Sequence, residues 1–146
     1  MSKIKGTHFL NVDLRVQSKS GLKELIDAFA PDVYELGSED PQCAVFEVNT
    51  TYKEHFDDNG IFKPPTIDET ILAFYNAIQA LPPTVRAIWD EAESRRFDIG
   101  IKTDDEHYQT NFFVSRENIE RLSSLKAGMR MALYASGDPK KYGFKG

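Results

Sequence analysis

The chain has 146 residues, of which 40% are hydrophobic and 28% are charged, and this composition indicates one globular domain rather than a disordered or membrane class. The net charge of −5 and the lack of a basic cluster exclude a nucleic-acid-binding protein, which gathers Lys and Arg against phosphates. No apolar run reaches the roughly 18 residues of a membrane span. A start without an apolar signal segment and a single cysteine, Cys43, predict a cytoplasmic protein without an internal disulfide.

Residues 8–17 alternate between apolar and polar side chains, which predicts a half-buried strand whose inward residues are Leu10, Val12, Leu14 and Val16. Ser18 or Ser20 is then expected to cap a helix with one apolar stripe, formed by Leu22, Leu25, Ile26 and Phe29. Two short extended segments follow at 32–37 and 43–49. The polar turn between them predicts a hairpin or two neighbouring strands.

Residues 50–65 break every periodicity and form a connection that is long for a compact domain, and long loops often carry function. The capping box from Thr66 to Glu69 then begins a helix, because the threonine hydroxyl and the glutamate satisfy free backbone amides. Its buried stripe is predicted to contain Ile67, Ile71, Phe74, Ile78 and Leu81. A pair of prolines ends this helix and opens a shorter one, whose apolar positions are Val85, Ile88, Trp89 and Ala92.

Residues 95–103 alternate again, and a turn leads into a second alternating segment at 108–114, so the two segments predict an antiparallel hairpin. Ser115 is expected to cap the next helix, whose core positions are Ile119, Leu122 and Leu125. Gly128 is expected to supply the left-handed stop of that helix. The apolar side of the last strand is predicted to consist of Met129, Met131, Leu133 and Ala135.

The predicted order of elements is β-α-β-β-α-α-β-β-α-β. This order indicates the α+β class: a single domain with a mainly antiparallel sheet of about six strands and helices packed mostly on one face. The domain is expected to span residues 1–136. Residues 137–146 are rich in glycine and lysine and are expected to form a flexible tail.

No catalytic or metal-binding motif is assembled in the sequence, so no catalytic residue, metal or cofactor is predicted. The candidates for an enzyme are His55 and His107, each of which lies next to carboxylates. Neither matches a metal motif such as two histidines one helical turn apart. A small-ligand or metal-dependent enzyme that uses one of these histidines is the alternative hypothesis.

Charge is spread unevenly along the chain, with −3 over residues 1–49, −5 over residues 50–94 and +3 over residues 95–146. An acidic surface suits a basic protein, and interfaces combine charge complementarity with buried aromatic anchors. The sequence therefore predicts a non-enzymatic protein-binding domain whose partner-binding residues are Tyr52, Glu54, Phe56, Asp57, Asp58 and Asp68. A further hypothesis is self-association through an edge strand or through the surface around Trp89.

Two stretches, IWDEAESRRFDIGI at 88–101 and FFVSRENIERLSSLKAGMRMALYAS at 112–136, carry a likeness to a known family. The residues that carry it are Trp89, Asp90, Arg96, Phe97, Ile99, Gly100, Ser115 and Tyr134. In these stretches the chain resembles the uncharacterised bacterial family labelled domain of unknown function 4279. The resemblance implies a shared fold and a bacterial origin, and it implies no activity. Related small α+β domains look like immunity or accessory proteins encoded near toxins, so such a role against a basic, toxin-like partner is the leading hypothesis.

Overall fold

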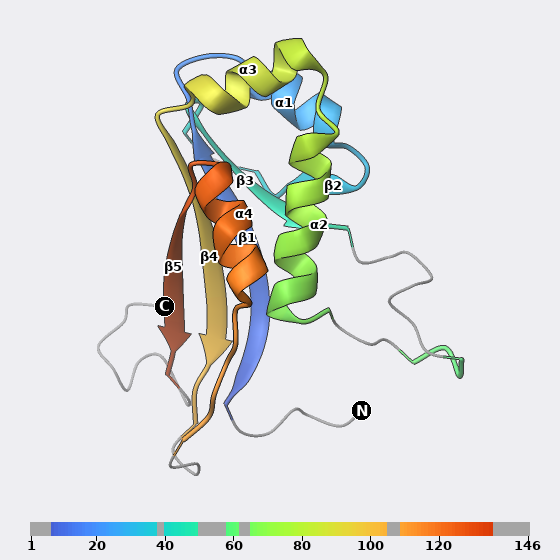
Figure 1. Cartoon of the computed structure of the whole chain (residues 1–146), viewed down its shortest axis with the longest axis vertical. Coiled ribbons are helices and arrows are strands. Elements are labelled where there is room, and N and C mark those ends of the chain that lie inside the picture. The colour runs from blue at the N-terminus through green and yellow to red at the C-terminus, as the bar shows by residue number, and fades with distance from the viewer. Residues whose placement is uncertain (1–6, 38–39, 50–57, 62–64, 105–108, 136–146) are drawn as a thin grey trace.

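The structure, a computed structural model, describes residues 7–37, 40–49, 58–61, 65–104 and 109–135 (Figure 1). Along the chain its elements are β1 (His8–Gln17), α1 (Leu22–Phe29), β2 (Val33–Glu35), β3 (Cys43–Val48), α2 (Ile67–Gln79), α3 (Pro83–Glu91), β4 (Ser94–Lys102), α4 (Arg116–Ser124) and β5 (Gly128–Tyr134). The predicted α+β class is confirmed, with a single sheet and four helices in the described part of the chain.

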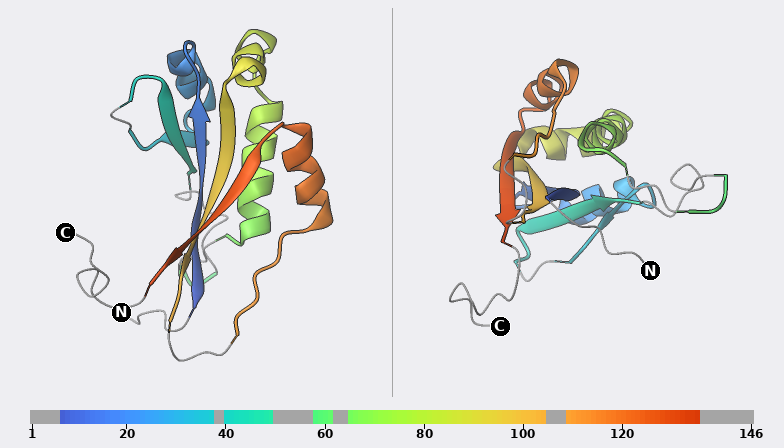
Figure 2. Two further views of the ribbon diagram at one scale, coloured as in Figure 1. Left: turned by 90° about the vertical axis from the view of Figure 1, so that its left-hand side faces the viewer. Right: turned by 90° about the horizontal axis from the view of Figure 1, so that it is seen from below.

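The strands of the sheet lie in the order β2-β3-β1-β4-β5. Neighbouring strands run antiparallel except β4 and β5, which run parallel. They are parallel because the connection through α4 returns the chain to the end of the sheet at which β4 begins. The helices lie together on one side of the sheet, and no described helix covers the other side (Figure 2). The domain therefore has two layers.

The sixth strand expected at residues 108–114 is wrong. The structure describes residues 109–114 of this segment, and they form a connection without strand pairing. Phe112 and Val114 pack against the core while Phe113 is exposed, which accounts for the alternation in the sequence. The edge of β4 that the expected hairpin would have used pairs with β5 instead. The alternation thus indicated which side chains of the segment face the core. It did not indicate that the segment pairs with another strand.

The core fills the space between the helices and the inward faces of the three central strands. These strands bury Val12, Leu14, Val16, Ala44, Phe46, Val48, Phe97, Ile99 and Ile101. The predicted stripe of α2 is confirmed, because Ile67, Ile71, Phe74, Ile78 and Leu81 are all buried. Two aromatic pairs tie helices to strands edge to face: the ring centroids are 5.4 Å apart for Phe74 and Phe97 and 5.1 Å apart for Phe29 and Phe46.

The start of α2 has the capping box that the sequence predicts. The hydroxyl of Thr66 accepts a hydrogen bond from the backbone amide of Glu69 at 3.1 Å, and the Glu69 carboxylate accepts one from the amide of Thr66 at 3.3 Å. Both amides would otherwise lack a partner inside the helix. The capping box therefore sets where the longest described helix begins above the sheet.

Two predicted core positions are exposed, and local geometry explains both. The pairing of β1 with β4 shifts register between Phe9 and Asn11, so Leu10 turns to solvent and Phe9 packs on the core in its place. On α4, Ile119 is exposed because the neighbouring Asn118 takes the buried position. A helix stripe read only from apolar residues cannot locate a buried asparagine.

The predicted ends of two helices also differ from the structure. Gly21, with φ +85°, is the N-cap of α1, and Ser18 instead donates its hydroxyl to a backbone carbonyl. A Cβ at position 21 would lie 2.7 Å from the side chain of Ile88, so the glycine permits close packing of α1 on α3. After α4, the left-handed residue is Lys126 rather than Gly128, which begins β5.

Trp89 and Arg95 join α3, β4 and the end of α4. Trp89 is fully buried and donates its indole N–H to the carbonyl of Leu125 at 3.3 Å. Arg95 donates to the carbonyls of Trp89 at 2.8 Å and of Ala92 at 3.0 Å. Its Nε donates to the carbonyl of Lys126 at 3.0 Å. A guanidinium suits these carbonyls, which carry the partial negative charge of helix ends. Because the side chain of Trp89 is buried in the core, it cannot contact a second copy of the chain.

The described strands and helices share one hydrophobic core. Among the described helices, none is both long enough and apolar enough to cross a bilayer. The predicted domain end at residue 136 and the flexible tail at 137–146 lie outside the described residues and stay predictions.

Candidate functional site

Only two of the six predicted partner-binding residues belong to the described part of the chain. The residues outside it are Tyr52, Glu54, Phe56 and Asp57, together with His55 and His107 of the alternative enzyme site. Asp58 is exposed in the turn at 58–61. A site built from residues 52–58 therefore stays a prediction.

Asp68, the other described member of that set, is bound inside the domain. Its carboxylate accepts hydrogen bonds from the backbone amide of Ser115 at 2.9 Å and from the side-chain amide of Asn118 at 2.8 Å. Asn118 also donates to the backbone carbonyl of Asp68 at 2.9 Å. These bonds link the first turn of α2 to the first turn of α4. The carboxylate of Asp68 thus has a structural task whether or not a partner binds.

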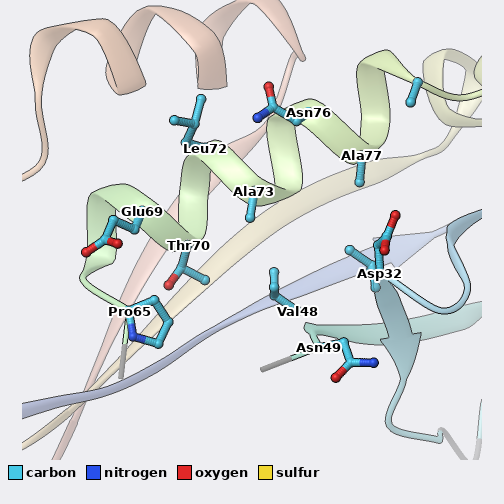
Figure 3. Close-up of a pocket in the computed structure, with 12 residues that line it drawn as sticks. Asp32, Val48, Asn49, Pro65, Glu69, Thr70, Leu72, Ala73, Asn76 and Ala77 are labelled. Atoms are coloured by element: carbon cyan, nitrogen blue, oxygen red, sulfur yellow. The ribbon is translucent and has the colours of Figure 1, made fainter. Parts of the chain in front are cut away.

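A groove of about 570 Å³ runs between α2 and the ends of β2 and β3 (Figure 3). Ala73 and Ala77 point from α2 towards Val48, so small apolar side chains of the helix face the strands across the groove (Figure 3). Asn49 and Pro65 lie at the rim of the groove. The segment 50–64, which holds most of the predicted partner residues, is therefore joined to this rim at both ends.

Two polar residues of this groove, Asn49 and Thr70, make hydrogen bonds within the fold. The side chain of Asn49 donates to the carbonyl of Pro31 at 3.0 Å, and its backbone amide donates to the carbonyl of Asp32 at 2.8 Å. The hydroxyl of Thr70 donates to the carbonyl of Thr66 at 2.8 Å. No histidine, cysteine, lysine or arginine is among the described residues that line the groove. The described lining of this groove thus presents no cationic side chain.

A row of ionisable side chains crosses the sheet on the face that no described helix covers. Register places Tyr34 opposite Glu47, Asp13 opposite Asp98, and Asp98 opposite Arg130. Glu47 lies beside Asp13 on the neighbouring strand. The row thus contains three carboxylates on adjacent strands, and like charges in such positions destabilise a sheet.

The two aspartates of this row differ in their countercharges. Asp98 accepts hydrogen bonds from Arg96 at 2.7 Å and from Arg130 at 3.0 Å. Asp13 accepts one from the uncharged amide of Asn11 at 3.2 Å. Partial burial, followed by the charges of Glu47 and Asp98, raises the pKa of Asp13 to about 6. Among the described residues, no group of three or more His, Cys, Asp or Glu side chains is arranged to hold a metal ion.

After the groove beside α2 and the row of ionisable side chains, the apolar face of β5 is the third candidate for a functional site. Met129, Met131 and Leu133 are 45%, 49% and 66% exposed. On the adjacent strand β4, their partners in register are Phe97, Ile99 and Ile101, all buried. The three β5 side chains therefore lie on the core side of the sheet, yet beyond the cover of the helices. We call these three residues the β5 face.

A second groove, of about 580 Å³, adjoins the β5 face. Its apolar lining consists of Ile101, Phe112, Met131 and Leu133, and polar residues of the connection after β4 form its rim. Phe113 in that connection and Ile119 on α4 are also exposed. Large exposed apolar patches are a common mark of protein-protein contact surfaces.

β5 is also an edge strand, since among the described strands it pairs only with β4. The carbonyl of Tyr134 accepts a hydrogen bond from the amide of Thr103 at 2.8 Å, so the backbone groups of Tyr134 face β4. Along a strand these groups alternate in direction. The N–H and C=O groups of Met129, Met131 and Leu133 therefore point away from the sheet, at its open edge.

Natural edge strands are commonly protected by charged residues, prolines or bulges. β5 has the sequence GMRMALY, in which the one charged residue is Arg130. That charge is already paired with Asp98 on the sheet face, at 3.0 Å. β5 thus combines unpaired backbone groups with an exposed apolar face and carries no free charge to repel an added strand.

The sequence placed Met129, Met131 and Leu133 on one side of a last strand but did not predict their exposure. The signal was present in the preceding helix. The segment 116–124 contains only two apolar residues, Ile119 and Leu122, which are too few to cover a further strand.

Comparisons with protein-family models, with curated proteins and with solved structures give no match for this chain.

Proposed function

We propose that the chain is a non-enzymatic protein-binding domain and that its binding surface is β5. The observation that carries this proposal is the seven-residue edge strand whose apolar face, Met129, Met131 and Leu133, is 45% to 66% exposed. An extended segment of a partner adds to such an edge through backbone hydrogen bonds, while side chains on alternate positions give specificity. The unbranched, polarisable methionine side chains adapt to the surface that covers them.

Site-specific photo-crosslinking tests this function. A photoreactive benzoylphenylalanine replaces Met131 in one variant and Leu36 in a control, because Leu36 is exposed to a similar degree, 46%, beyond the end of β2. We expect adducts to another polypeptide chain at position 131 and none at position 36. A captured protein counts only if, once purified, it binds the wild type and fails to bind a Met131→Lys variant.

Adducts at position 36 with none at position 131 would contradict the proposal. So would a captured protein that binds Met131→Lys as tightly as the wild type. Mass spectrometry of the adducts separates a second copy of the chain from a different protein, so the nature of the partner is read in the same experiment.

A second candidate function is the binding of a basic, toxin-like protein by the acidic region at residues 50–94, as in an immunity or accessory protein. Its support is the charge of −5 over residues 50–94 and the attachment of residues 50–64 to the rim of the α2 groove. The resemblance to the family labelled domain of unknown function 4279 belongs to the same proposal. Substitution of Glu54, Asp57 and Asp58 by lysine tests whether this region binds the basic protein. Asp68 is left unchanged in that variant, because it supports the fold.

An enzyme that uses His55 or His107 is the remaining alternative, and no described residue supplies an observation in its favour. Metal analysis of protein purified without chelator tests it. A stoichiometric metal that is lost in a His55→Ala or His107→Ala variant would support the enzyme over the binding domain.

A further inference from the structure

We infer that the strand added to β5 is β5 of a second copy, antiparallel to the first, with the two-fold axis at Met131. This inference rests on the proposed function and names its partner. In this arrangement position 131 lies opposite position 131 of the second copy, and position 129 lies opposite position 133. All seven residues of β5 are then paired.

The backbone of β5 fits this register. The groups that point outward belong to Met129, Met131 and Leu133, as the hydrogen bond from Thr103 to Tyr134 indicates. In an antiparallel pair, hydrogen-bonded positions are those at which both residues direct their N–H and C=O towards each other. Each of the three outward residues meets another outward residue, and every such pair exchanges two hydrogen bonds.

The side chains of β5 fit the same register. On the apolar face, Met129 meets Leu133 and Met131 meets its own copy. On the other face, Arg130 meets Ala132 and Gly128 meets Tyr134, so no like charges lie opposite each other. The charge of Arg130 is balanced by Asp98 of its own chain.

The neighbouring registers are worse. A shift by two positions one way places Arg130 opposite Arg130 of the second copy, which sets two positive charges against each other. The same shift the other way leaves two residues at the start of β5 unpaired. The register centred on Met131 is thus the one that pairs the whole strand without charge repulsion.

The other edge of the sheet does not offer an equal contact. β2, at that edge, has three residues, Val33–Glu35, against seven in β5. Joining two chains through β5 keeps both helix layers on the same side of a continuous sheet, because the two-fold axis is perpendicular to it. The two β5 faces then form one apolar strip between the helix layers, where the side chains of the two strands pack side by side.

Sedimentation equilibrium of the purified full chain tests the self-association. We expect a reversible dimer for the wild type and for Leu36→Lys, an exposed control on the other edge. Met131→Lys places two lysines at the two-fold axis and should weaken the dimer about a hundredfold. A strict monomer at about 1 mM wild-type protein, or a Met131→Lys dimer of unchanged affinity, would overturn the inference.

Engineered cysteines test the register in a Cys43→Ala background. Met131→Cys should form a disulfide-linked dimer under mild oxidation, because the two Cα atoms at the axis are about 5.5 Å apart. Met129→Cys and Leu133→Cys should not cross-link alone, since equivalent positions are roughly 13 Å apart along the strands. A mixture of these two variants should cross-link. The opposite pattern, with Met129→Cys alone cross-linking, would refute the register.

The two proposals fail in different ways. A monomeric chain whose position 131 crosslinks to a different protein refutes the second copy and leaves β5 as a binding surface. A monomeric chain that forms no adduct at position 131 refutes both.

Discussion

β4 and β5 lie side by side in one sheet, have apolar residues on the same face, and differ completely in the burial of those residues. Phe97, Ile99 and Ile101 on β4 are at most 2% exposed. Their neighbours on β5, paired with them in parallel register, are 45% to 66% exposed. The difference between the two strands is therefore not one of sequence pattern or of sheet face.

What separates the two strands is the cover above them. α2 buries four apolar residues over the central strands, whereas α4 has two apolar residues and buries only one of them, Leu122, beside Asn118. Hydrophobic free energy is gained only where apolar area leaves water, so the sheet extends one strand beyond the area its helices cover. In the proposed function, the apolar residues of β5 gain this free energy when another chain covers them.

The sharpest way to break this comparison is to truncate one residue on each strand within the same row. Phe97→Ala should lower the free energy of unfolding by about 3 to 5 kcal/mol, because it leaves a cavity against Phe74. Met129→Ala, at the partner position, should cost less than about 1 kcal/mol. Urea unfolding at micromolar protein measures both values. Equal losses would mean that β5 is covered within the single chain.

The next largest effect on stability is expected where α4 is attached to α2, because the position of α4 decides how much of the sheet the helices cover. Asp68→Ala removes the acceptor for the Ser115 amide and for buried Asn118, and should cost about 2 kcal/mol. Asp58→Ala, an exposed control from the same acidic region, should change stability by less than about 0.5 kcal/mol. A neutral Asp68→Ala would show that these bonds do not hold α4 in place.

A smaller effect is expected on the opposite face of the sheet, at Asp13. The pKa of Asp13 is about 6 in the folded protein and 3.8 ordinarily, so folding favours its protonated form. The ionised carboxylate of Asp13 therefore lowers the free energy of unfolding above pH 6. This destabilisation disappears as the pH falls through 6 towards 4. Asp13→Asn should be more stable than the wild type at pH 7, by under about 1 kcal/mol because the side chain is partly solvated, and equal at pH 4. A constant difference at all pH values would contradict this assignment.

The smallest effect on the single chain is predicted for Leu133→Thr. At micromolar concentration its free energy of unfolding should match the wild type within about 0.5 kcal/mol, because the residue is 66% exposed. At high concentration the wild type should gain stability from the paired β5 strands, and the variant should gain less. Concentration-independent unfolding of both proteins would count against a role for Leu133 between chains.

The sequence predicted most of the fold where local chemistry decides the structure. The stripe of α2 and its capping box from Thr66 to Glu69 were predicted in full, because helical spacing and amide capping act within one segment. Alternation also placed Val12 and Leu14 of β1 correctly. It failed at Leu10, where the bulge depends on how β1 pairs with β4.

The candidate site was harder to predict because it depends on which elements become neighbours. The alternation at 108–114 reflected packing of Phe112 and Val114 on the core, without strand pairing. The exposure of Met131 follows from the reach of α4 across the sheet, which no local pattern encodes. Likewise, the charge of Asp68 was read as surface because its acceptor role to Asn118 joins positions 50 residues apart.

Amide hydrogen exchange at Met129, Met131 and Leu133 tests most directly whether β5 is open in the single chain and covered by another chain. At micromolar concentration these three amides should exchange rapidly, whereas those of Arg130 and Ala132, which face β4, should be protected. Raising the concentration, or adding a partner captured at position 131, should protect the three outward amides. Slow exchange at the lowest concentration, or rapid exchange under every condition, would contradict β5 as the binding surface.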